Sequence, residues 1–101
     1  MKLKHLAEGK YEKAIELYEK FIVDSLKNQK IKDVGMAYHN MGIVYDTQQK
    51  HGLAIDCFKK ALENHKIVNN YSGVSWGYFS IGLIFGKLNN YESILDTIKK
   101  Q

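Results

Sequence analysis

Histidine and cysteine are the residues of this 101-residue chain whose side chains are best suited to metal binding or catalysis. Such residues bind zinc or act as bases and nucleophiles when they meet at helical spacing of three or four residues. Here they lie far apart, and none forms a pair that suggests a metal site or an activated nucleophile: His5, His39, His51, His65 and Cys57. We interpret the cysteine as a small, half-buried apolar residue.

The glycines also offer no catalytic motif. They fall within helical patterns rather than in a phosphate-binding loop, and no dinucleotide-binding motif occurs. We therefore expect a protein that is not an enzyme and that uses no metal and no cofactor.

The charged residues disfavour nucleic acid as a ligand. The net charge is +4, but the lysines are interspersed with acidic residues, as where Glu12 precedes Lys13 and Lys32 precedes Asp33. The sequence contains no arginine, the residue best suited to bidentate recognition of phosphate and guanine. We expect a solvated surface of mixed charge and no binding to nucleic acid.

Compartment and membrane contact follow from the apolar residues and the cysteine count. The longest strongly apolar stretch, residues 81–86, is far shorter than the ~20 residues of a membrane-spanning helix. The N-terminus has no apolar segment of signal-peptide length, and a single cysteine favours a reducing compartment. We expect a cytoplasmic protein that does not bind membranes.

A repeat with a period of 40 residues organises the sequence. Residues 9–14 align with residues 49–54 and again with residues 89–94 at the same offset. The offset also relates a motif of aromatic, apolar and glycine residues to a second copy: Tyr38, Met41, Gly42 and Tyr45 to Tyr78, Ile81, Gly82 and Phe85. One constant offset at so many positions indicates an internal repeat.

Each repeat reads as two helices. Tyr38, Met41 and Tyr45 have helical spacing and predict a helix over residues 33–48, and Ala54, Phe58, Ala61 and Leu62 predict one over 52–67. A tight polar turn separates these helices, and longer polar connections are expected near residues 27–30 and 64–71. No useful period-2 alternation occurs, so we predict no strands.

These residues resemble the tetratricopeptide repeat family. Its pattern is an aromatic residue, a Leu-Gly pair and a tyrosine in the first helix, then an alanine, an aromatic and a small residue in the second. The middle unit supplies Tyr38, Met41, Gly42, Tyr45, Ala54, Phe58 and Ala61. The third supplies Tyr78, Ile81, Gly82, Phe85, Ile94 and Ile98, and the first Ala14, Tyr18 and Phe21.

The resemblance implies an all-α, right-handed solenoid of antiparallel helix pairs with about two and a half repeats. We expect one domain over residues 1–101, with a partial repeat at 1–30 and repeats at 31–70 and 71–101. The period exceeds the 34 residues usual in the family, and the helix-ending proline is missing. Glycines 42 and 82 are expected to let the paired helices approach closely.

A candidate binding groove lies on the opposite side of the first helices. In stacked helix pairs these helices line a concave surface. The residues facing away from the repeat core are Met36, His39, Asn40, Ile43, Thr47, Trp76, Phe79, Ser80, Leu83 and Lys87. The helix over residues 74–87 is then apolar on two sides, and exposed apolar patches mark interaction sites. We predict a protein or peptide partner anchored by Trp76 and Phe79.

The family resemblance adds a role for Asn40. Peptide-binding members commonly carry an asparagine at this place, where it fixes the peptide backbone. Some members of the family bind the C-terminal carboxylate of a peptide with basic residues on neighbouring first helices. Trp76 and Ser80 stand at the places of those basic residues in this sequence. An apolar ligand is therefore favoured over a charged chain end.

Two alternatives stay open at this stage. Uncapped repeat ends expose core-like surface, so the chain could form a homo-oligomer, in one form by exchange of a helix. The repeat spacing also resembles the peptide-sensing domains of bacterial regulators, of which this chain could be a fragment.

Overall fold

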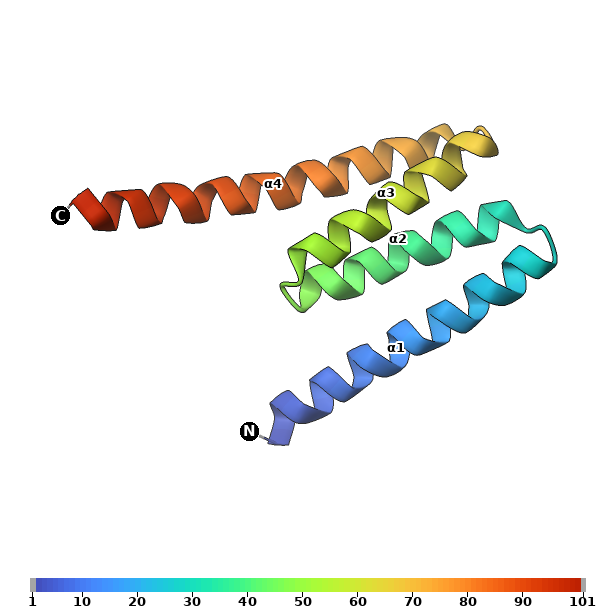
Figure 1. The fold of residues 1–101 in the computed structure, drawn as a ribbon, viewed down its shortest axis with the longest axis horizontal. Helices are drawn as coiled ribbons and strands as arrows, with labels where there is room; N and C mark the ends of the chain where they lie inside the picture. Colours follow the sequence, from blue (N-terminus) through green and yellow to red (C-terminus); the bar gives the residue numbers. More distant parts are fainter. Residues whose placement is uncertain (1, 101) are drawn as a thin grey trace.

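The computed structural model describes residues 2–100, with side chains placed for residues 8–93 and 95–100. This part consists of four α-helices: α1 (Lys2–Lys27), α2 (Ile31–Thr47), α3 (His51–Ile67) and α4 (Tyr71–Lys100). Successive helices run in opposite directions, and α2 and α3 lie between α1 and α4 (Figure 1). The all-α helical repeat expected from the sequence is confirmed, and α2 and α3 lie close to the predicted helices.

Three turns of one kind join the helices, at residues 28–30, 48–50 and 68–70. The middle residue of each has a positive φ, namely Gln29, Gln49 and Asn69. The next N–H then donates to the carbonyl five residues earlier, as Lys50 does to Tyr45 at 2.9 Å. This is the Schellman motif, which satisfies carbonyls that a helix end would leave unpaired.

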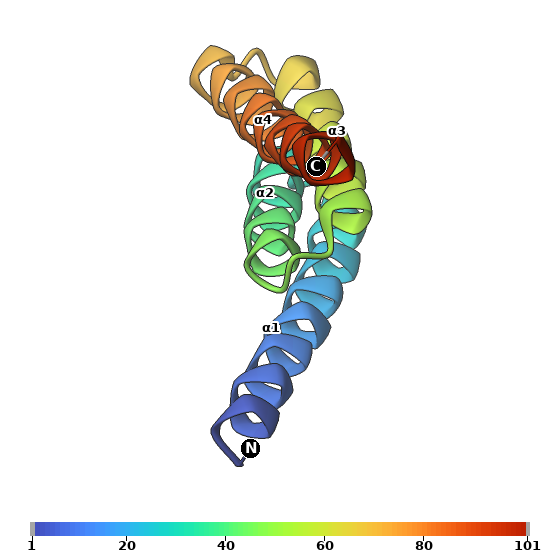
Figure 2. The ribbon, with the colours of Figure 1, turned by 90° about the vertical axis from the view of Figure 1, so that its left-hand side faces the viewer.

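The core lies on both sides of α2 and α3. α1 packs against α2, α2 packs against α3, and α4 packs against α3 and α2. Figure 2 shows α1 and α4 at opposite ends of this stack. One cluster of buried residues joins α1, α2 and α3: Ile22, Val34, Ala37, Met41 and Cys57. A second joins α3 and α4: Ala54, Phe58 and Ile84.

Two expectations about the connections are wrong. The link between α3 and α4 is no longer than the turn inside the repeat, because a Schellman motif reverses the chain after one left-handed residue. The first and third units also lack the predicted internal turn. α1 and α4 run without a break through residues 8–10 and 88–90, which correspond to the turn at 48–50.

The continuous helices have a physical reason. A turn with a non-glycine residue in the left-handed region costs about 1–2 kcal/mol and requires a new helix to nucleate. Packing of Phe58 and Ala54 against α2 and α4 offsets this cost in the middle unit. In α4, continuing the helix past residue 90 adds a hydrogen bond per residue without a new nucleus.

The predicted core of the third unit is also partly wrong. In α2 and α3 the expected core residues are buried or half-buried: Tyr38, Met41, Gly42, Tyr45, Ala54, Phe58 and Ala61. In α4, Ile81 is half-buried, but Tyr78, Gly82 and Phe85 are exposed because no helix folds back over them within residues 2–100. α4 instead buries Gly77 and Ile84 against α3. The side chain of Ile94 lies outside the described residues.

Candidate functional site

α2 and α4 meet along one side of the molecule. The His39 ring lies edge-on to the Trp76 ring, with centroids 6.4 Å apart, and Trp76 is edge-on to Phe79 at 5.9 Å. At the other end, Lys87 Nζ donates to Asp46 Oδ2 at 3.1 Å. These contacts join the two first helices into one surface, the α2–α4 face.

Apolar side chains on the α2–α4 face remain open to solvent. Each is between 47% and 60% exposed: Met36, Ile43, Trp76, Phe79 and Leu83. Ile43 and Leu83 occupy equivalent places, 40 residues apart, and Thr47 and Lys87 follow them one turn later. Exposed apolar groups gathered in this way are typical of an interaction surface.

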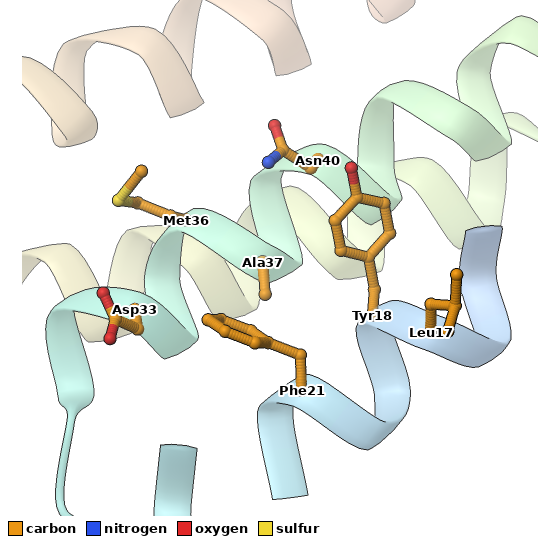
Figure 3. Close-up of a pocket in the computed structure, with 7 residues that line it drawn as sticks. All are labelled: Leu17, Tyr18, Phe21, Asp33, Met36, Ala37 and Asn40. Carbon is orange, nitrogen blue, oxygen red and sulfur yellow. The ribbon is translucent and has the colours of Figure 1, made fainter. Parts of the chain in front are cut away.

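A hollow lies between α1 and α2 at one edge of this face (Figure 3). It has a volume of about 360 Å³ and is lined mainly by apolar groups: Leu17, Tyr18, Phe21, Asp33, Met36, Ala37 and Asn40. Met36 and Asn40 therefore lie beside α1, whereas the sequence placed them in one groove with Trp76. Asn40 is half-buried, and its side chain points away from α1 in Figure 3.

A second hollow lies at the start of α4. It is lined by Ser72, Ser75, Trp76 and Phe79. Ser80, predicted to face the groove, is half-buried, while Leu83 and Lys87 continue the exposed stripe. Of the predicted groove residues, Met36 and Asn40 thus line the first hollow, and Trp76 and Phe79 line the second.

Three titratable groups near this face have pKa values shifted in favour of their neutral forms. Burial lowers the pKa of His39 below the ordinary value of a histidine, and positive charge on His65 lowers it further. Burial also lowers the pKa of His65 and raises that of the Cys57 thiol. In the described part of the chain no group of three or more histidine, cysteine or acidic side chains could hold a metal ion.

Sequence reasoning missed Leu17 and Phe21 as surface residues. Both are large and about half exposed beside the hollow between α1 and α2. Their equivalents 40 residues later, Cys57 and Ala61, are buried, and Cys57 packs in the cluster with residues of α2. The repeat alignment could have revealed this exposure. It places the large Leu17 and Phe21 of α1 where α3 has the small Cys57 and Ala61.

The comparisons with known proteins agree with the helix pair at the centre of the fold. The family model described as tetratricopeptide repeat matches residues 37–64, which span most of α2 and α3. Residues 37–64 are a tetratricopeptide repeat. Neither the comparison with curated proteins nor the one with solved structures found a match.

The repeat at residues 37–64 suggests a general class of function. Tetratricopeptide repeats are generally non-catalytic modules that contact proteins or peptides, and their stacked helices create extended concave surfaces. Among the described residues, no helix combines the length and apolar character needed to cross a membrane.

Proposed function

We propose that this chain is a non-catalytic tetratricopeptide module that binds an apolar segment of another protein on its α2–α4 face. The central anchors are Trp76, Phe79 and Leu83 of α4, with Ile43 of α2 opposite them. The observation that carries the proposal is the exposure of these four side chains, at 47–60%, on helices already joined by the His39–Trp76 contact.

The chemistry of the face favours an apolar partner. The hollows contain few charged groups, and the ion pair of Asp46 with Lys87, which joins α2 to α4, lies at the far end. Trp76 and Phe79 form a rigid edge-to-face pair, and aromatic side chains lose little conformational freedom when a partner covers them. We also propose that the protein is cytoplasmic, because Cys57 is a buried free thiol of the kind that reducing compartments maintain.

The test uses peptides selected from a random library against the wild-type chain. Their affinity is then measured for two variants of matched exposure, Leu83→Glu and Phe85→Glu. Both residues are about half exposed and lie two positions apart on α4, so they point to different sides of the helix. We expect Leu83→Glu to lose about tenfold or more in affinity, because a charge replaces a buried apolar contact, and Phe85→Glu to bind as the wild type does.

Trp76 gives an independent readout of the same binding. It is the single tryptophan of the sequence and is 60% exposed, so its emission reports directly on the α2–α4 face. A bound apolar peptide should shift this emission to shorter wavelength. Failure to select any binding peptide, or equal losses in the Leu83 and Phe85 variants, would overturn the proposal.

A further inference from the structure

One side of α4 lacks the helix that covers the same side of α2. In α2, a β-carbon added to Gly42 would lie 2.6 Å from the Phe58 ring of α3. In α4, no atom of another described helix lies within 4 Å of a β-carbon built on Gly82. Tyr78 and Phe85, which flank this glycine, are about half exposed. α4 therefore presents a surface shaped for a second helix that the described chain does not supply.

One side of α1 likewise lacks the helix that covers the same side of α3. Cys57 and Ala61 of α3 are 7% and 0% exposed, and Cys57 belongs to the buried cluster that α3 forms with α2 and α1. Their equivalents in α1, Leu17 and Phe21, are 58% and 47% exposed. The other side of α1 is well covered, since α2 buries Ile22. α1 thus resembles the second helix of a repeat whose first helix is missing from residues 2–100.

These two surfaces fit one another. We propose that a second copy of this chain covers them, with α1 of one copy packing on α4 of the next as α3 packs on α2. The occupant is specified by the repeat itself, because α4 is the equivalent of α2, and α1 is the equivalent of α3. The centre of this contact lies on the Gly82 side of α4, and at its edge the contact takes in Met36 of the α2–α4 face. It does not depend on peptide binding.

The 40-residue offset gives the register of the contact. Gly42 meets Phe58 within the middle repeat, so Gly82 meets Tyr18 of the next copy. Lys60 Nζ lies 5.5 Å from the centre of the Tyr38 ring, and the equivalent of Lys60 at the junction is Lys20 of the next copy. Lys20 would there join Lys66 of the same chain as Tyr78, whose Nζ already lies 5.4 Å from the centre of the Tyr78 ring. The contact of a glycine with an aromatic ring is therefore reproduced.

The hollow between α1 and α2 belongs to the same junction. Within the chain, α2 packs against both α3 and α4. The equivalent place for α4 of one copy lies against α1 and α2 of the next, where Leu17, Phe21 and Met36 line an apolar hollow of about 360 Å³. Filling it would cover the largest apolar groups that α1 exposes beside α2.

The continuous helices also suit this junction. A covalent turn is needed at residues 48–50 because α2 and α3 belong to one chain. At the junction the two helices belong to different chains, so α4 continues past residue 90 and α1 extends before residue 8, as both do here. Since the two surfaces differ, the contact is head-to-tail and leaves a free surface at each end, which gives open chains rather than a closed dimer.

The first test compares Gly82→Asp with Gly86→Asp by sedimentation over a wide range of concentration. Both positions are open in the described chain and receive the same residue, the same charge and the same gain in helix propensity. At position 86 the change reproduces Asp46, which α2 accommodates at the equivalent place; at position 82 it obstructs Tyr18 of the next copy. We expect the average mass to grow with concentration beyond a dimer in the wild type and in Gly86→Asp, and to stay at 11.7 kDa in Gly82→Asp.

The second test uses complementation. Leu17→Glu blocks the α1 surface and leaves α4 free, whereas Gly82→Asp does the reverse. Each variant alone should remain a monomer, and their mixture should form a one-to-one dimer that grows no further. Circular dichroism checks that each variant folds, and Phe85→Glu replaces Gly82→Asp if that chain does not. A wild type that is monomeric at every concentration, a closed dimer, or a mixture that stays monomeric would overturn the proposal.

Discussion

The Phe58 ring occupies the space next to Gly42 where any larger residue would place its β-carbon. That atom would lie 2.6 Å from Cε1 of the ring, closer than β-carbons approach other atoms in proteins. The ring is 2% exposed and also lies against His39, with centroids 5.0 Å apart. The separation of α2 and α3 is therefore set by the pairing of a glycine with an aromatic side chain.

Gly42→Ala should destabilise the chain. Overpacking against the Phe58 ring costs about 1–3 kcal/mol. Replacing glycine by alanine inside a helix gains roughly 1 kcal/mol in helix propensity, so the upper part of the overpacking range gives a net loss of stability. A thermal melt followed by circular dichroism at low concentration should show a lower midpoint. Gly82→Ala is the matched control and should be neutral or stabilising, because its β-carbon meets no atom of another described helix. Equal shifts in both variants would contradict this account.

Phe58→Ala should cost about 3–5 kcal/mol of unfolding free energy, since it leaves a cavity among Ala54, Ile84 and the residues packed on them. Phe85→Ala removes the same atoms from a side chain that is half exposed, and should cost far less. Urea unfolding of the two variants measures the difference. A Phe58 variant no less stable than the Phe85 variant would show that the second cluster is not the core.

The sequence predicts the middle of this fold better than its ends. The spacing of Tyr38, Met41, Phe58 and Ala61 reports local helix–helix packing, and α2 and α3 follow from it. The turns at residues 8–10 and 88–90 were expected from the same pattern but do not form. A turn depends on whether the returning helix has enough surface to pack against, and that is not encoded in the residues of the turn itself. Gly9 and Asn89 could adopt the left-handed conformation of Gln49, yet both stay helical.

The candidate site was predicted in outline only. The exposed positions of Ile43, Trp76, Phe79 and Leu83 agree with their spacing on the first helices. The hollow beside Met36 and Asn40 could not be assigned without knowing that α1, rather than a first helix of an earlier repeat, lies next to α2. Side-chain periodicity identifies which face of a helix is apolar, but the neighbour that covers this face is a property of the tertiary packing.

Asn70→Ala should destabilise α4. The Oδ1 atom of Asn70 accepts a hydrogen bond from the Gly73 N–H at 3.1 Å, which caps the first turn of the helix. Loss of such a cap costs about 0.5–2 kcal/mol. Lys50 stands in the equivalent place before α3 and makes no side-chain cap, so Lys50→Ala is the control and should leave stability nearly unchanged. Urea midpoints that fall equally in both variants would argue against a capping role.

His65 should make the fold less stable in mild acid. Its side chain is buried between α2 and α4, with Gly35 and Gly73 beside the ring. Because Asn70 Oδ1 accepts from Gly73, the Asn70 amide faces His65 and donates to Nδ1 at 3.3 Å, which requires that nitrogen to be unprotonated. Burial accordingly lowers the pKa of His65, and that of His39 is lowered as well.

The direction of the effect follows from the proton balance. A histidine in the unfolded chain binds a proton near pH ~6.5, whereas these two bind it at lower pH when folded. Below about pH 6.5 the unfolded state therefore holds more protons than the folded state, so the free energy of unfolding should be constant above about pH 7 and fall as the pH drops below about 6.5. Urea unfolding across this window measures the slope, and His65→Gln should flatten it. A fold that grows more stable on acidification, or a slope unchanged in His65→Gln, would show that His65 is not held neutral by its site.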